Sequence, residues 1–446
     1  MVETISLKRL SSDGSAVGRL ADGRAVFVDY GCPGDVVRVM IDEDRPRFAR
    51  GHVGALVQAS PLRVTPPCPH FGWGACGGCR WQHLLPSAAL AAKRDAIIDA
   101  MQRIAGIADA ESLTLPIIGS PADYEYRNKI ELDARTVRGH LSLGLHRAGS
   151  AELVEPGSCP LFSAPFKDLL NSVQGALRYS LGSADVGLSR VALRYSARTK
   201  SFELACMTRP GSFPRARVAS TCKAACPEIT SIVRVMQKTT AGRGSRKHPI
   251  PVLKGVEALF GAGYWKERLA GFPYKVSAPS FFQVNTAATE GLVEIVKAAL
   301  ELDGSEHACD LYSGVGAFSL PLAASARRLT VVESSGPAVR DLRRNLAEAD
   351  LSAEVIAGQL GRDTEDIGQP DAVLVDPPRA GLSAAAICAI EQMAPERLVY
   401  VSCDPATLAR DLRLLTASSF RLESLRPVDL FPQTPHVECV AKLRKV

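Results

Sequence analysis

The chain has 446 residues, of which 46% are hydrophobic and 22% are charged, and its formal net charge is +6. A chain longer than roughly 250–300 residues divides into several domains, and this composition excludes disordered and fibrous proteins. The mild positive charge permits a polyanionic partner without requiring one. The start lacks the apolar core of a signal peptide, and no stretch approaches the roughly 20 apolar residues of a membrane span. We therefore expect a cytoplasmic protein with no membrane association.

Residues 1–60 predict a small β-barrel. Alternating stretches such as GRAVFVDY and GDVVRVMID are separated by glycine-bearing turns, and this periodicity of two is typical of about five short strands. The stretch resembles the TRAM domain, an RNA-binding barrel attached to several RNA-modifying enzymes. Two basic segments are candidates for RNA contact, with solvated loops as the alternative: residues 45–52, and residues 242–254, which include Arg243, Arg246 and Lys247.

Residues 61–270 predict a mixed α+β domain with a group of cysteines. A helix is expected at SAALAAKRDAIIDAMQRIAG, and strands are expected at KIELDAR and LSLGLHR. Cys68, Cys76 and Cys79 lie in CPHFGWGACGGC, and Cys159 follows in GSCPLF. In a reducing compartment, four such cysteines suit a tetrahedral zinc ion or a [4Fe–4S] cluster. Four isolated buried thiols are the remaining alternative, and the composition does not name the metal.

Residues 271–446 predict a Rossmann-like α/β domain. The apolar runs HACDLYS, RLTVVES, DAVLVDPP and RLVYVSC alternate with helical spacers. Buried strands alternating with helices indicate a parallel sheet that is covered on both faces.

The first strand of this domain ends in a turn that suits a nucleoside cofactor. Gly314 and Gly316 allow a sharp bend, and the next strand ends at Glu333. The carboxylate of Glu333 can accept hydrogen bonds from both hydroxyl groups of a ribose. Asp376 ends the following strand, on the edge where open α/β sheets bind ligands. The incomplete glycine pattern makes NAD the weaker prediction. S-adenosylmethionine fits better, because its charged groups need carboxylates and carbonyls rather than a phosphate-binding loop.

Cys403 and Glu438 form a candidate catalytic pair. Cys403 lies between a strand and the helix that begins at Asp404-Pro405, and a helix N-terminus favours a thiolate. A thiolate that adds to carbon 6 of uracil makes carbon 5 nucleophilic, so that it can accept a methyl group. A base must then remove the proton from carbon 5, and Glu438 in an apolar final strand is the candidate. An inert buried thiol is the alternative for Cys403.

Together, FFQVN, DLYSGVGAFSLPLA, VVES, DPPRAGL, YVSCDPATLARDL and HVECV resemble the bacterial RNA uridine-5 methyltransferases, in that order and spacing. The resemblance extends over essentially the whole chain. It implies a class I methyltransferase domain with Cys403 as the nucleophile and Glu438 as the base. The positions implied to contact S-adenosylmethionine or to shape the site around the target base are Gln283, Tyr312, Glu333 and Asp376. Ala317 replaces a frequent Asn, so a polar cofactor contact is not implied there.

The resemblance also implies a metal group and a substrate. It implies a [4Fe–4S] cluster held by four ligands, with seven residues rather than five between the first two: Cys68, Cys76, Cys79 and Cys159. We expect Cys222 and Cys226 to be packing residues. Among RNA substrates, 23S ribosomal RNA is favoured over the T-loop uridine of tRNA. No obligate protein partner is evident.

Two other functions remain open from the sequence. An amino-group methyltransferase of adenine or cytosine needs no nucleophile, but it usually has an aromatic residue at the position of Arg379. A non-catalytic RNA-binding iron–sulfur protein is the alternative from another class, and the presence of both Cys403 and Glu438 argues against it.

Overall fold

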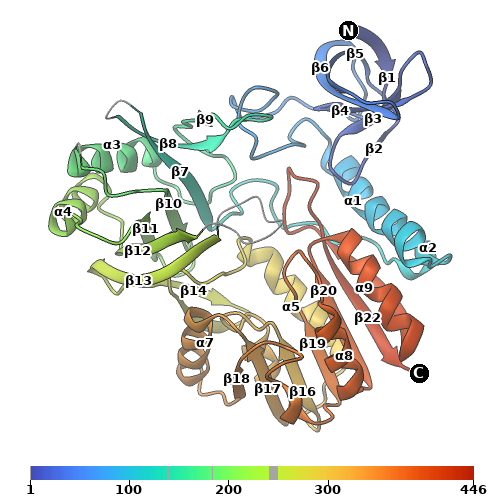
Figure 1. Ribbon diagram of the computed structural model, residues 1–446, viewed down its shortest axis with the longest axis vertical. Coiled ribbons are helices and arrows are strands. Elements are labelled where there is room, and N and C mark those ends of the chain that lie inside the picture. The colour runs from blue at the N-terminus through green and yellow to red at the C-terminus, as the bar shows by residue number, and fades with distance from the viewer. Residues whose placement is uncertain (1, 138–139, 183, 241–249) are drawn as a thin grey trace.

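A computed structural model describes the chain at residues 2–137, 140–182, 184–240 and 250–446 (Figure 1). Arg243, Arg246 and Lys247, which we expected to contact RNA, lie outside these residues. Within the described ranges no helix is long and apolar enough to cross a membrane. The sheets confirm the predicted fold class: an N-terminal β domain, a central mixed domain and a C-terminal α/β domain. The domain boundaries at residues 60 and 270 stay predictions.

The N-terminal domain is a six-stranded sheet in the order β1-β5-β6-β4-β3-β2. Inward and outward residues alternate along its strands, and Val26, Val28, Val37 and Val39 are fully buried in one core. One strand has only two residues, too few to leave an alternating pattern in the sequence. The strands are β1 (Val2–Ser6), β2 (Arg9–Leu10), β3 (Ala16–Arg19), β4 (Ala25–Asp29), β5 (Val36–Asp44) and β6 (Phe48–Gln58).

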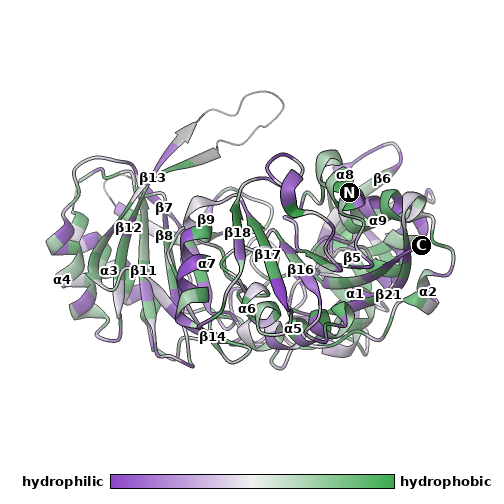
Figure 2. Ribbon diagram, turned by 90° about the horizontal axis from the view of Figure 1, so that it is seen from below, coloured by the Kyte–Doolittle hydropathy of each residue, from purple (hydrophilic) through white to green (hydrophobic). Residues whose placement is uncertain are grey.

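The central domain is a seven-stranded sheet in the order β13-β12-β11-β10-β7-β8-β9, with α3 and α4 packed on one face (Figures 1 and 2). Cys222 and Cys226 are buried in the core between these helices and the sheet. The elements are β7 (Lys129–Val137), β8 (His140–His146), β9 (Leu153–Val154), α3 (Leu169–Leu181), β10 (Arg190–Tyr195), β11 (Phe202–Thr208), α4 (Arg215–Ala225), β12 (Ser231–Thr240) and β13 (Ile250–Gly261).

A hairpin of β14 (Trp265–Leu269) and β15 (Phe272–Val276) leads into the C-terminal sheet, whose order is β18-β17-β16-β19-β20-β22-β21. The first five strands in this order run parallel, and β22 is antiparallel to both neighbours. The strands are β16 (His307–Leu311), β17 (Arg328–Glu333), β18 (Glu354–Ala357), β19 (Ala372–Val375), β20 (Arg397–Ser402), β21 (Phe420–Val428) and β22 (Glu438–Lys445).

Helices cover both faces of this sheet, as the buried strands predict. Helices α5 and α7 share one core with it, and α8 and α9 share the other. The strand order reverses at β16, because β17 lies on one side of it and β19 on the other. A ligand crevice is therefore expected at the carboxyl ends of these strands. The helices are α5 (Thr286–Leu300), α6 (Ser319–Ala323), α7 (Gly336–Glu348), the 3₁₀ turn η2 (Glu365–Ile367), α8 (Ala384–Met393) and α9 (Pro405–Ser418).

The helix predicted near residue 90 is present, but it packs on the C-terminal sheet. It comprises α1 (Pro86–Ala100) and the π-helical turn η1 (Met101–Ala105), and α2 (Ala110–Leu113) follows. Buried residues of α1 and η1 join the core of α9 and β21, and Figure 1 shows α1 near α9. Residues of this segment therefore reach the C-terminal sheet from a distant part of the sequence.

Candidate active site and cysteine-lined cavity

The turn after β16 is built around main-chain angles that favour glycine. Tyr312, Gly314 and Gly316 have φ values of 67°, 57° and 96°. A Cβ on Gly316 would lie 2.7 Å from side-chain carbons of Leu320 and Leu342, so this position needs glycine for space as well as for its φ angle. The backbone therefore bends sharply directly after the carboxyl end of β16.

Glu333 holds this turn from the end of β17. Its Oε2 accepts a hydrogen bond from the Gly314 nitrogen at 2.8 Å, and its Oε1 accepts one from the Ser335 nitrogen at 2.6 Å. Tyr312, Glu333 and Gly358 line a common cavity of about 180 Å³. Two predicted cofactor residues thus meet at one cavity, and a carboxylate in its wall fits the hydroxyl groups of a ribose.

Gln283 belongs to a segment that is fixed from both sides. Its side chain is buried, and its carbonyl accepts a hydrogen bond from Asn128 Nδ2 at 2.9 Å. Asn285 caps α5, because its Oδ1 accepts from the Ala288 nitrogen at 3.1 Å. The neighbouring Phe281 is 67% exposed. In the FFQVN motif, Asn285 therefore caps a helix and Gln283 is held in place, while Phe281 is exposed to solvent.

A buried carboxylate that the sequence reasoning missed lies just before the cofactor turn. Asp310 Oδ2 accepts a hydrogen bond from Ser319 Oγ at 2.5 Å, whereas Oδ1 is buried without a partner among the described residues. Burial raises the pKa of Asp310 to about 7. Burial and the charge of Asp310 also raise the pKa of Asp376, at the end of β19. An acidic residue inside the apolar run HACDL was the available signal for this unpaired acceptor.

Cys403 and Glu438 lie next to each other across two antiparallel strands. Ser402 of β20 pairs with Cys439 of β22, so the residue after Ser402 lies beside the residue before Cys439. Glu438 is only 5% exposed, and burial, together with the Glu438 carboxylate, raises the pKa of the Cys403 thiol to about 11. Burial and Asp376 raise the pKa of Glu438 itself. The lowering expected from the α9 N-terminus is therefore outweighed by burial and neighbouring carboxylates.

Arg379 is the cation of this site. Its guanidinium lowers the pKa values of Cys403 and Glu438, which opposes the larger effect of burial on both groups. It also lies 3.4 Å from Nε2 of His436, whose pKa is lowered to about 4 by burial and by Arg379. His436 is therefore neutral at physiological pH. The sequence reasoning used Arg379 only to argue against an amino-group methyltransferase.

The four predicted ligand cysteines line one cavity of about 350 Å³: Cys68, Cys76, Cys79 and Cys159. Burial raises the pKa of Cys79 to about 12. Within the described ranges, no group of three or more His, Cys, Asp or Glu residues could hold a metal ion in the present arrangement. The longer loop between the first two cysteines carries Trp73, which stacks on His52 of β6 with ring centroids 4.4 Å apart.

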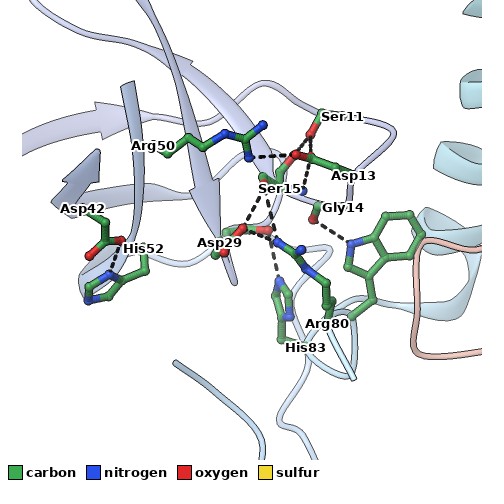
Figure 3. Close-up of polar contacts among 12 residues, drawn as sticks. Ser11, Asp13, Gly14, Ser15, Asp29, Asp42, Arg50, His52, Arg80 and His83 are labelled. Atoms are coloured by element: carbon green, nitrogen blue, oxygen red, sulfur yellow. Dashed lines mark hydrogen bonds and ion pairs between the residues drawn. The ribbon is translucent and has the colours of Figure 1, made fainter. Parts of the chain in front are cut away.

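The residues after Cys79 join the N-terminal domain to this region. Figure 3 shows the Arg80 guanidinium directed at the carboxylate of Asp29, and these two groups form an ion pair. The Trp81 indole nitrogen donates to the carbonyl of Gly14 at 2.9 Å. The cysteine-bearing loop is therefore a physical connection between the N-terminal domain and the rest of the molecule.

Family models match three parts of the chain: a TRAM domain at residues 2–53, a methyltransferase small domain at 284–399, and a tRNA (Uracil-5-)-methyltransferase model at 365–446. The chain is 36% identical to an uncharacterized RNA methyltransferase of Nitratidesulfovibrio vulgaris, covering 99% of this chain and 96% of that protein. It is 32% identical to one of Bacillus cereus, covering 98% and 95%. The chain belongs to the RNA uracil-5 methyltransferase family. It is an S-adenosylmethionine-dependent RNA (uracil-5-)-methyltransferase, as the sequence predicts.

A solved structure covers the whole of this methyltransferase. The chain is similar to the tRNA (uracil-54, C5)-methyltransferase of Pyrococcus abyssi in complex with S-adenosyl-L-homocysteine, with a TM-score of 0.74, 26% identity and 99% coverage of both chains. The match therefore extends over nearly the whole length of both chains. The domain organisation of this methyltransferase is therefore shared with an archaeal enzyme.

Proposed function

We propose that the enzyme methylates carbon 5 of a uridine in RNA through a covalent bond between Cys403 and carbon 6, and that Glu438 resolves this adduct. The observation that carries the proposal is the register of β20 and β22, which puts the thiol beside a buried carboxylate. Both residues lie on the edge of the sheet that also carries the Gly314 turn and Asp376. A nucleophile, a base and a cofactor turn thus converge on one edge.

The chemistry proceeds in two halves. The Cys403 thiolate forms a bond to carbon 6, and the electrons of the ring double bond move towards carbon 5 and oxygen 4. Bound S-adenosylmethionine supplies an electrophilic methyl group for carbon 5. Glu438 then takes the proton of carbon 5, the ring double bond forms again, and the electrons of the sulfur–carbon bond return to Cys403. Arg379 favours the thiolate before the addition.

The cofactor is proposed to lie along the carboxyl ends of β16, β17 and β19. Glu333 is suited to the ribose hydroxyl groups, because its carboxylate lies in the wall of the cavity with Tyr312. Asp376 and Gln283 are proposed to contact the cofactor or to shape the site around the target base. The unpaired Oδ1 of Asp310 adds an acceptor near the same turn. The substitution at Ala317 leaves only main-chain groups there, and its carbonyl accepts from Tyr274 Oη at 3.4 Å.

We propose 23S ribosomal RNA as the substrate, on the resemblance of the chain to ribosomal RNA enzymes that combine a barrel with a cysteine cluster. The uridine at position 54 of tRNA is the second candidate, because the archaeal relative of the same domain organisation is named for that activity. For both candidates we propose that the N-terminal TRAM domain contributes to RNA binding, and a cytoplasmic location agrees with either.

Purified enzyme is expected to methylate unmodified 23S ribosomal RNA in preference to unmodified tRNA. The measurement uses S-adenosylmethionine with a labelled methyl group and transcripts of both RNAs, followed by digestion and identification of 5-methyluridine. Uridines tritiated at carbon 5 provide a second readout, because each turnover releases the tritium from carbon 5 into water. Label in tRNA alone would assign the second candidate, and label in neither RNA, or on adenine or cytosine, would contradict the proposed function.

We also propose that the four cysteines hold a [4Fe–4S] cluster. A zinc ion binds its sulfur ligands at about 2.3 Å, and a site that tight would bring the four thiols into one close group. The described thiols instead surround a cavity of about 350 Å³, which leaves room for a polynuclear cluster between them. Burial keeps free thiols protonated, whereas cysteines that bind iron do so as thiolates. Binding to iron would therefore explain why four cysteines surround one buried space.

Anaerobically purified protein is expected to be brown and to contain about four irons per chain. Replacing Cys79 with serine is expected to remove most of the iron and the visible absorbance, because one of four thiolate ligands is lost. Cys226→Ser is the matched control, since Cys226 is buried in the core of the central domain and does not line the cavity. Stoichiometric zinc without iron would contradict the proposed cluster.

A further inference from the structure

The loop between β21 and β22, residues 429–437, has no regular secondary structure and leads directly into Glu438. Four consecutive carbonyl oxygens of this loop nevertheless accept hydrogen bonds from four separate parts of the chain. The pairs are Asn285 Nδ2 to Leu430 O at 3.1 Å, Lys93 Nζ to Phe431 O at 3.0 Å, Tyr126 Oη to Pro432 O at 3.0 Å, and the nitrogens of Arg80 and Trp81 to Gln433 O at 3.0 Å. The loop is therefore fixed mainly by contacts from outside, although the Thr434 nitrogen and hydroxyl group also donate to the Phe431 carbonyl, at 3.3 and 2.8 Å.

Lys93 makes the charged contact among these four. It lies on α1 with its side chain fully buried, and its Nζ is 2.6 Å from Asp429 Oδ1. Asp429 Oδ1 also accepts from the Phe431 nitrogen at 3.0 Å, so the ammonium and the carboxylate together fix the first turn of the loop. Lys93 and Asp429 are 336 positions apart in the sequence. The contact therefore ties two distant segments together next to the active site.

A buried ion pair contributes little net stability compared with apolar side chains of similar volume. Its directional hydrogen bonds do fix orientation, however, and here they act on both ends of a three-residue turn. We propose that Lys93 is a positioning residue, which sets the direction in which the loop presents the Glu438 carboxylate to carbon 5 of the target uridine. This inference rests on the proposed role of Glu438.

The test measures where the reaction stops in Lys93→Met. Methionine keeps much of the apolar length of lysine but removes the ammonium, so the loop loses its fixed direction. We expect normal binding of S-adenosylmethionine and normal formation of the adduct, but release of methylated RNA about 10²-fold slower, as for other small misplacements of a catalytic group. Denaturing gels with labelled RNA show the trapped adduct as a slow band, and thermal unfolding checks the fold.

A second variant covers the case in which Lys93→Met does not fold because Asp429 is left unpaired. Lys93→Met combined with Asp429→Leu removes both charges, keeps the site apolar and still leaves the Phe431 carbonyl without its ammonium. Arg397→Met is the matched control, because Arg397 pairs with buried Glu306 at the opposite end of β20. We expect that variant to lose stability without trapping RNA.

The outcomes separate the two proposals. Trapped RNA in Glu438→Gln and in a folded Lys93 variant, but not in Arg397→Met, supports the positioning role. Trapped RNA in Glu438→Gln alone overturns that role and leaves the proposed function intact. Trapped RNA in Arg397→Met has the same consequence, because it would show that any loss of a buried ion pair near the sheet slows release. If Glu438→Gln releases RNA normally, the assigned base is wrong and the positioning role falls with it. If neither Lys93 variant unfolds cooperatively, the pair serves the fold, which also overturns the proposal.

Discussion

Cys403→Ala is expected to lower methyl transfer by at least about 10³-fold, because without the thiolate carbon 5 never becomes nucleophilic. The variant is expected to bind RNA and S-adenosylmethionine as the wild type does, since the sulfur contributes little to either contact before the addition. Methyl incorporation and denaturing gels measure the two halves of this expectation: no methyl transfer, and no covalent protein–RNA band.

The matched control is Cys388→Ala, the same chemical change at an exposed free thiol on α8. It is expected to methylate RNA at the wild-type rate. The reaction of the wild type is also expected to accelerate with rising pH below about pH 11, because the Cys403 thiol, with its pKa raised to about 11, then loses its proton more often. Methylation by Cys403→Ala near the wild-type rate would show that the proposed mechanism is wrong.

The strand ends of the candidate site could be predicted from the sequence. Glu333, Asp376 and Cys403 each lie at the end of an apolar, β-branched run, and the carboxyl ends of parallel strands meet at one edge of the sheet. Local pattern thus fixes which residues face the crevice. Glu438 could be predicted in a different way, as a carboxylate in an otherwise apolar strand. The register that puts it beside Cys403 comes from the antiparallel insertion of β22, which no local pattern shows.

Contacts between distant segments account for what the sequence did not reveal. Lys93 lies in AAKRDA, where a lysine is typical of a solvated helix face, yet it is fully buried because α1 packs against the loop before β22. The raised pKa of Cys403 was not apparent from the sequence either, since burial and the neighbouring Glu438 depend on the packed fold rather than on the adjacent helix. Both cases arise because burial is a property of the tertiary structure, while charge and periodicity are local.

Glu438→Gln is expected to stop the reaction after methyl transfer, about 10²- to 10⁴-fold below the wild-type turnover, because the proton of carbon 5 has no base to accept it. Cys403 still adds to carbon 6 in this variant, so RNA stays attached to the protein and runs as a slow band on a denaturing gel. Tritium at carbon 5 of the uridine is expected to remain on the trapped RNA. Release of that tritium at the wild-type rate would show that another group is the base.

Stability provides an independent test of the same carboxylate. Burial and Asp376 raise the pKa of Glu438 in the folded state, so at pH values above its unfolded pKa the folded chain binds more protons than the unfolded chain. Its contribution to the free energy of unfolding therefore falls as the pH rises from about 4.5 through the folded pKa. The amide introduced by Glu438→Gln cannot ionise, so the variant is expected to unfold at a higher temperature than the wild type at neutral pH, with the difference vanishing near pH 4.

Glu203→Gln is the matched control for catalysis: Glu203 is a buried carboxylate of β11 with a raised pKa, and its loss is expected to trap no RNA. A Glu438→Gln variant that traps RNA while gaining thermal stability would show that the carboxylate is kept at this position for proton transfer and at the expense of stability.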